Sequence, residues 1–161
     1  MVSVWQEVFD NKDKVKEDTI VEVWKGGATS WGRTMSEVTK SGLRFILSSP
    51  WYLNYISYGA DWVKYYQADP HNFAGTEKQK KLVIGGEACL WGEFVNSVNL
   101  IPRLWPRASA VAERLWSPAS VTNIKEAAHR LQEMECRLLQ RGYPVQPANG
   151  AGFCDVVWEG P

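Results

Sequence analysis

The chain has 161 residues and a mass of 18.2 kDa, and its 45% hydrophobic and 22% charged side chains are typical of a globular protein with a real core. Eighteen basic side chains balance eighteen acidic ones, which argues against a basic surface for nucleic acid or anionic membranes and favours a neutral partner. No apolar run approaches the roughly 20 residues that span a bilayer. Residues 1–5 have neither the basic nor the apolar part of a secretory signal.

Short apolar strands and a helix alternate in the first part of the chain. Residues 2–5 and 20–24 are apolar runs of strand length. A helix is expected over residues 34–41, closed by Gly42, and a third strand over residues 43–48, ended by Ser49 and Pro50. The pattern predicts a strand-helix-strand unit over residues 20–48.

The second part of the chain is mainly helical. A short amphipathic helix is expected at residues 61–67, a strand at 82–88, and helices at 106–116 and 123–140. The last helix has the clearest signals, because Asn123 and Glu126 have capping-box spacing and Gly142 supplies a stop. Its apolar residues recur at helical spacing: Ile124, Ala127, Leu131, Met134 and Leu138.

Alternating strands and helices predict an α/β fold with a parallel sheet. The continuous apolar character of residues 45–47 and 82–84 suits strands that are covered on both faces. Each strand is followed by a segment rich in functional groups, as on the catalytic face of a (β/α)8 barrel. Only about four strands are visible, whereas a complete barrel takes ~250 residues. The sequence therefore predicts half of a barrel.

Nine tryptophans are present, and three of them stand beside acidic residues in Trp5-Gln6-Glu7, Glu22-Val23-Trp24 and Trp91-Gly92-Glu93. An indole offers a flat apolar face to the C–H side of a sugar, and a carboxylate accepts hydrogen bonds from its hydroxyls. These phrases indicate a sugar site. The alternative is ordinary packing, which we assign to the other six: Trp31, Trp51, Trp62, Trp105, Trp116 and Trp158.

The three cysteines are not spaced for a metal site, and no metal or cofactor is expected. Cys136 lies late in the last helix and Cys154 in the tail beyond it, so a bridge between them would contribute about 3 kcal/mol on the loop-entropy model and imply an oxidising compartment. Cys89 is expected to be a buried small hydrophobe. Three reduced thiols remain the alternative.

The carboxylates Glu7, Glu22, Glu87 and Glu93 offer a different hypothesis, in which two of them form an acid and nucleophile pair. We reject it as the leading hypothesis because Glu22 and Glu87 lie in strand runs. Carboxylates at such positions are expected to be structural groups with satisfied hydrogen bonds.

Long phrases of the chain resemble lysosomal β-hexosaminidase of glycoside hydrolase family 20. They are Trp5-Gln6-Glu7-Val8-Phe9-Asp10, Ser49-Pro50-Trp51-Tyr52-Leu53-Asn54, Gly85-Gly86-Glu87-Ala88-Cys89-Leu90-Trp91-Gly92-Glu93, Pro102-Arg103-Leu104-Trp105-Pro106-Arg107-Ala108 and Ala112-Glu113-Arg114-Leu115-Trp116-Ser117. The resemblance implies that residues 1–161 are the C-terminal half of a catalytic TIM barrel, strands five to eight with closing helices. The N-terminal domain and the first four strands would be absent.

The family's reaction is substrate-assisted and retaining, since the acetamido oxygen of a terminal N-acetylhexosamine attacks its own anomeric carbon. An adjacent Asp-Glu pair at the end of the fourth strand orients the acetamido group and supplies the general acid. That pair precedes Met1 in the family's order. The resemblance thus implies a glycoside hydrolase of which this chain alone is inactive.

The resemblance also implies roles for individual residues, at the positions that match the family's motifs. Trp5 and Trp24 match the walls of the acetamido pocket, and Tyr52 matches the catalytic tyrosine whose hydroxyl steadies the acetamido oxygen. The matched sugar-binding positions are Trp91 under the ring, Glu93 at the ring hydroxyls and Asn54 at the hydroxymethyl oxygen.

Further positions bear on specificity and assembly. Tyr55 stands where one mammalian subunit type has a basic residue that helps accept anionic glycans, which predicts a preference for neutral substrates. Tyr58 matches a tyrosine at the interface of the family's dimers. Cys136 and Cys154 match a C-terminal disulfide, with one extra residue between them. Lysosomal placement follows from the resemblance alone, and no Asn-x-Ser/Thr glycosylation site occurs.

Three hypotheses of function follow. The first is a fragment of a β-N-acetylhexosaminidase that hydrolyses terminal N-acetylhexosamine, with glycans as partners. The second is a sugar-binding module without catalysis. The third is a truncated product with no stable fold of its own, because a half-barrel exposes strand edges.

Overall fold

The computed structural model describes residues 2–55, 57–152 and 154, and the chain separates into two compact units. Unit 1 comprises residues 1–52 and 68–88, and unit 2 comprises residues 53–67 and 89–161. Unit 1 carries the sheet, whereas unit 2 is helical.

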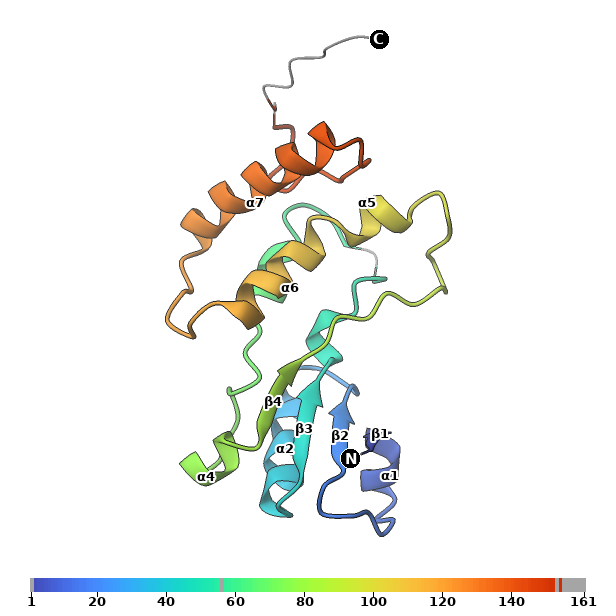
Figure 1. Cartoon of the computed structure of the whole chain (residues 1–161), viewed down its shortest axis with the longest axis vertical. Coiled ribbons are helices and arrows are strands. Elements are labelled where there is room, and N and C mark those ends of the chain that lie inside the picture. The colour runs from blue at the N-terminus through green and yellow to red at the C-terminus, as the bar shows by residue number, and fades with distance from the viewer. Residues whose placement is uncertain (1, 56, 153, 155–161) are drawn as a thin grey trace. The chain divides into compact units, whose positions relative to one another are not determined.

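Within the described residues, the sheet of unit 1 is four-stranded and wholly parallel. Its strands, in spatial order, are β1 (Ser3–Trp5), β2 (Ile20–Val23), β3 (Arg44–Leu47) and β4 (Val83–Gly86) (Figure 1). All residues of β2 are buried, as expected for an inner strand covered on both faces. The strands lie side by side in the order of the chain, and each neighbouring pair is parallel. This confirms the predicted α/β class with a parallel sheet.

Helix α2 (Ala28–Lys40) covers β2 and β3, and Met35 and Val38 of this helix are fully buried. The predicted start at residue 34 is wrong. Gly32 and the Ser and Thr residues of the first turns have low helix propensity, so the pattern does not reveal them. Packing of the apolar face stabilises the whole helix instead. Gly42 has φ +85°, as a residue that ends a helix should.

Four short helical elements were not predicted from the sequence. They are α1 (Gln6–Asp10), the 3-10 helix η1 (Ser49–Trp51), α4 (Glu77–Lys80) and α5 (Leu100–Leu104). Elements of three to five residues are too short to show an amphipathic period. A local signal was present only for α4, because Thr76 and Gln79 form a capping box.

Unit 2 contains the other helices that the sequence predicted: α3 (Trp62–Gln67), α6 (Arg107–Trp116) and α7 (Ile124–Gln140). The Asn123 side chain caps α7 by accepting from the backbone N–H groups of Lys125 and Glu126. The core of the unit consists of Trp62, Tyr66, Ala110, Ala127, Leu131 and Ala148. Packing is thus confirmed for Trp62, whereas Trp116 is 94% exposed and Trp158 lies outside the described residues.

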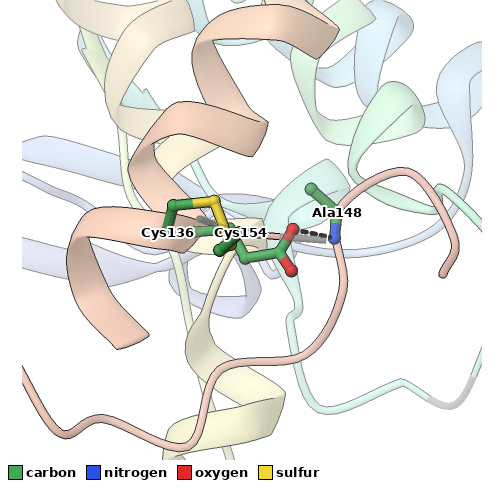
Figure 2. Close-up of a disulfide and its surroundings, with 4 residues drawn as sticks. Cys136, Ala148 and Cys154 are labelled. Atoms are coloured by element: carbon green, nitrogen blue, oxygen red, sulfur yellow. Dashed lines mark hydrogen bonds between the residues drawn. A yellow bond between two sulfur atoms is a disulfide. The ribbon is translucent and has the colours of Figure 1, made fainter. Parts of the chain in front are cut away.

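The segment after α7 is fastened to that helix at two neighbouring positions. Cys136 and Cys154 form a disulfide with their Cα atoms 5.3 Å apart, which confirms the predicted pairing. Beside it, the Glu135 carboxylate accepts a hydrogen bond of 2.8 Å from the backbone N–H of Ala148 (Figure 2). Cys89 is buried and unbridged, also as predicted.

A buried ion pair links the start of α3 to α6. Arg107 Nε donates to Asp61 Oδ2 at 2.8 Å, and the two side chains are 0% and 8% exposed. Arg107 Nη1 donates to the carbonyl of Arg103, while its Nη2 has no hydrogen-bond partner among the described residues. Across the described part of the chain, no helix combines the length and the apolar character needed to cross a membrane.

Candidate functional site

Three aromatic residues predicted for the site gather in unit 1. Trp5 ends β1, Trp24 follows β2 and Tyr52 follows η1. The rings of Trp24 and Tyr52 are stacked with centroids 6.4 Å apart, and Trp5 meets Trp24 edge-on at 6.2 Å. Because the carboxyl ends of parallel strands meet at one edge of the sheet, residues 47 positions apart in the chain form one aromatic surface there.

Tyr52 owes its position to Trp51 and Gly86. The Trp51 side chain is fully buried, and a Cβ built on Gly86 would stand 1.9 Å from Trp51 Cζ3. Only glycine at the end of β4 leaves room for this indole. The Trp51 backbone N–H also bonds the Ser48 carbonyl at 2.9 Å, which fixes the turn that delivers Tyr52.

The indole of Trp24 has a carboxylate partner. Trp24 Nε1 donates to Glu7 Oε2 at 3.0 Å, and this hydrogen bond lowers the pKa of the Glu7 carboxyl below its usual range. From the sequence, Glu7 was a candidate partner for sugar hydroxyls or an acid or nucleophile, and its bond to Trp24 was not predicted. No local sequence signal marked α1 (Gln6–Asp10), so the sequence did not show that Glu7 would meet Trp24.

A buried carboxyl group lies within the sheet beside these rings. Glu22 pairs in register with Trp5 on one side and Ile46 on the other, and it is only 9% exposed. Its Oε1 has no hydrogen-bond partner among the described residues, so the expectation of a fully satisfied carboxylate is wrong for this atom. Burial, followed by the nearby charge of Glu87, raises the pKa of Glu22 to about 6.

The raised pKa of Glu22 predicts a loss of stability between pH 4.5 and 6. In this window the folded state holds a proton that the unfolded state has released, so unfolding becomes easier by about 2 kcal/mol as the pH rises through the folded pKa. Glu22→Gln is expected to abolish this loss. Urea titrations from pH 4 to 8, with hydrogen exchange in β2 as the readout, measure the difference from wild type.

The matched control is Glu37→Gln, which alters an exposed carboxylate on α2 of the same unit. This variant should keep the wild-type pH dependence. Equal slopes in wild type and Glu22→Gln would contradict the assignment of the proton to Glu22.

The remaining predicted sugar contacts belong to unit 2. The Leu53 N–H donates to the Cys89 carbonyl at 2.8 Å, which brings the segment of Asn54 beside the one that continues to Trp91 and Glu93. Asn54 is 3% exposed, and its Oδ1 has no hydrogen-bond partner among the described residues. Trp91 is 42% exposed and Glu93 is exposed as well.

Two hollows formed by described residues lie away from these side chains. One of about 800 Å³ in unit 1 is lined by Phe9, Val15 and acidic side chains, including Glu37. Another of about 720 Å³ in unit 2 runs between α6 and α7. Neither contains a predicted sugar contact. The candidate site is identified by the aromatic and carboxyl side chains at the strand ends.

Comparison with known families decides the affiliation of this chain. The catalytic domain of glycosyl hydrolase family 20 matches residues 1–119. The chain belongs to glycosyl hydrolase family 20. This result confirms the resemblance seen in the sequence and identifies the chain as part of a glycoside hydrolase.

Curated relatives in the family are β-hexosaminidase subunits. The chain is 57% identical over 152 residues to subunit beta from Mus musculus, covering 94% of this chain and 28% of the relative. It is 54% identical over 157 residues to subunit alpha from Bos taurus, covering 97% and 30% respectively. The chain therefore spans less than a third of the relatives it matches.

Solved structures of family 20 enzymes share the fold. The Flavobacterium johnsoniae chitobiase matches with a TM-score of 0.71 and 28% identity, covering 87% of this chain and 21% of that one. A Streptomyces plicatus N-acetyl-β-hexosaminidase in complex with a ligand, Thio-NAglucal, matches with a TM-score of 0.75 and 23% identity, covering 92% and 33%. These similarities agree with the α/β architecture and parallel sheet.

Proposed function

We propose that residues 1–161 are the C-terminal half of the catalytic barrel of a β-N-acetylhexosaminidase. In this proposal β1 to β4 are barrel strands five to eight, and α6 and α7 belong to the closing helices. An N-terminal domain and the first four strands make up the rest of the enzyme. The parallel sheet, the family match and the small share of each relative that this chain spans support the assignment.

The substrate is a glycan that ends in non-reducing N-acetylhexosamine. Its acetamido oxygen attacks the anomeric carbon as the glycosidic bond breaks and the general acid protonates the leaving oxygen, which gives an oxazolinium intermediate, so the enzyme needs no nucleophile of its own. Trp5 and Trp24 confine the acetamido group near that carbon, which makes the attack effectively intramolecular. The Tyr52 hydroxyl donates to the acetamido oxygen and steadies it as charge develops. The single observation that carries this proposal is the cluster of these three rings.

The positions that match the family's other sugar contacts are residues of unit 2. The exposed Trp91 offers an indole face to the ring, and the exposed Glu93 carboxylate accepts from ring hydroxyls. Asn54 contacts the hydroxymethyl oxygen, and its unpartnered Oδ1 is an acceptor for that hydroxyl. A buried acceptor without a partner is costly unless a ligand satisfies it.

The general acid is expected to come from the Asp-Glu pair of the longer protein, since the sequence of this chain contains no Asp-Glu dipeptide. The purified chain should therefore release no product from a chromogenic N-acetylglucosaminide. Turnover by this chain alone would contradict the proposed division of the active site. Restoring the missing half should restore turnover.

Sugar binding without catalysis is the second candidate function, favoured by the aromatic cluster in a chain without the acid pair. Isothermal titration with the thiazoline analogue of N-acetylglucosamine, together with a turnover assay after the missing half is supplied, distinguishes the two functions. Binding without turnover, even when the missing half is supplied, supports a sugar-binding module. Binding by this chain, with turnover once the missing half is supplied, supports a fragment of the hydrolase.

Tyr55 is expected to make the longer enzyme prefer neutral glycans. The residue is 58% exposed and carries no charge to pair with a sulfate group. Tyr55→Arg should raise kcat/KM for a 6-sulfated glucosaminide about 10-fold, the effect of one partly exposed charge-assisted hydrogen bond. The unsulfated substrate is the control and should change little. Equal cleavage of both substrates by wild type would contradict the prediction.

The assembly and location of the longer protein follow from the same family assignment. Tyr58 is 93% exposed in unit 2 and is proposed to contact the second subunit of a dimer. We place the enzyme in the lysosome, as the β-hexosaminidase resemblance implies. The disulfide between Cys136 and Cys154 fits an oxidising secretory route to that compartment.

A further inference from the structure

The side chains of α1 hold the segment of Trp24 at several points. No residue separates β1 from α1, so Gln6, Glu7 and Asp10 stand beside the end of β2. Trp24 Nε1 donates to Glu7 Oε2 at 3.0 Å, and the backbone N–H of Lys25 donates to Gln6 Oε1 at 3.2 Å. These bonds fix both the ring and the main chain at the end of β2.

Lys25 completes this network. Its Nζ lies 2.9 Å from Asp10 Oδ2 and 3.5 Å from Glu7 Oε1. The Glu7 carboxylate therefore receives the indole N–H on one oxygen and the ammonium group near the other. We define this set, Glu7, Asp10, Trp24 and Lys25, as the α1 brace.

We propose that Glu7 is a positioning residue, which sets the plane of the Trp24 indole against the acetamido group of the sugar. The inference rests on the proposed function, in which Trp24 walls the acetamido pocket. Glu7 acts through Trp24 and does not itself touch the reacting atoms.

The geometry explains why such a residue is needed. An indole can turn about two side-chain bonds, and Trp24 is not fully buried. Its neighbours Trp5 and Tyr52 meet it through ring contacts, which are weakly directional. A carboxylate acceptor adds a directional, charge-assisted bond at the ring edge. Small displacements matter because substrate-assisted attack depends on reacting atoms held about 3–3.5 Å apart.

The acceptor also suits an acidic compartment. The Trp24 bond is the main cause of the lowered pKa of Glu7, and a backbone hydrogen bond and then the positive charge of Lys25 act in the same direction, although burial opposes them. The carboxylate thus remains ionised, and able to accept the indole N–H, at pH values where an ordinary glutamate begins to gain a proton.

The indole N–H signal of Trp24 in nitrogen-15 NMR spectra tests the brace without any ligand. Trp24→Phe assigns the signal. Glu7→Ala is expected to shift it and to raise its exchange rate with water at least 10-fold, whereas Glu7→Gln keeps an acceptor and should preserve most of the protection. Glu17→Ala, an exposed carboxylate of the same unit, is the control. An unchanged signal in Glu7→Ala would overturn the inference.

Titration with N-acetylglucosamine thiazoline then tests the positioning role. Glu7→Ala is expected to weaken binding about 10-fold, because a displaced Trp24 indole contacts the acetamido group less well. Glu7→Gln should weaken binding no more than about 3-fold, because the amide oxygen still accepts the indole N–H. Equal affinity of Glu7→Ala and wild type would overturn the role. If wild type binds no thiazoline, the proposed sugar binding fails, while the NMR signal still decides whether the α1 brace exists.

Discussion

Replacing Arg107 with alanine is expected to lower the free energy of unfolding of unit 2 by about 3–5 kcal/mol, because it leaves the Asp61 carboxylate buried without its counter-ion. Both side chains are almost completely buried, and Arg107 also donates to the Arg103 carbonyl. Asp61 further accepts from the Ser57 hydroxyl, in the segment that carries Asn54 and Tyr58. The variant should therefore loosen the proposed contacts to the sugar and to the second subunit.

Urea denaturation, with hydrogen exchange in α3 and α6 as the readout, measures this effect. The matched control is Arg137→Ala, which removes an exposed ion pair with Glu133 on α7 and should cost less than about 0.5 kcal/mol. The double variant Asp61→Leu, Arg107→Met removes both charges and should regain most of the loss. A cost for Arg107→Ala close to that of the control would contradict a structural role for the pair.

Replacing Trp51 with alanine should destabilise unit 1 by about 3–5 kcal/mol, since truncation of a fully buried indole leaves a large cavity. The loss also frees the turn that places Tyr52 against Trp24. Binding of the thiazoline should weaken in parallel. Chemical denaturation and calorimetric titration measure the two effects.

Gly86 provides a sharper test of the same contact. Gly86→Ala alone should destabilise unit 1 because the new Cβ overlaps the Trp51 ring, and it should be much better tolerated when Trp51 is already alanine. Trp116→Ala, which truncates an exposed tryptophan, serves as the control and should change stability little. If the losses of stability from Gly86→Ala and Trp51→Ala were additive, the close contact between Gly86 and the Trp51 ring would be contradicted.

Local patterns predicted the regular elements well. The apolar runs at β2 and β3 and the capped, amphipathic α7 were found close to their observed positions. The start of α2 and the short helices α1, α4 and α5 were missed, because weak propensity and short length leave no periodic signal. For the site, the phrases around Trp5, Trp24 and Tyr52 carried the prediction, and these three rings do gather at one edge of the sheet.

The amino-acid sequence by itself determined the fold class, the family, the disulfide between Cys136 and Cys154 and the residue types that could hold an N-acetylated sugar. The fold class follows from the alternation of strands and helices, whereas the family, the disulfide and these residue types follow from the resemblance of its motifs to glycosyl hydrolase family 20. Only the tertiary structure decided that Glu7 accepts the Trp24 indole N–H, that Glu22 keeps an unsatisfied buried oxygen and that Arg107 pairs with Asp61. These relations join residues from different elements, and their distances and burial are set by strand register and helix packing.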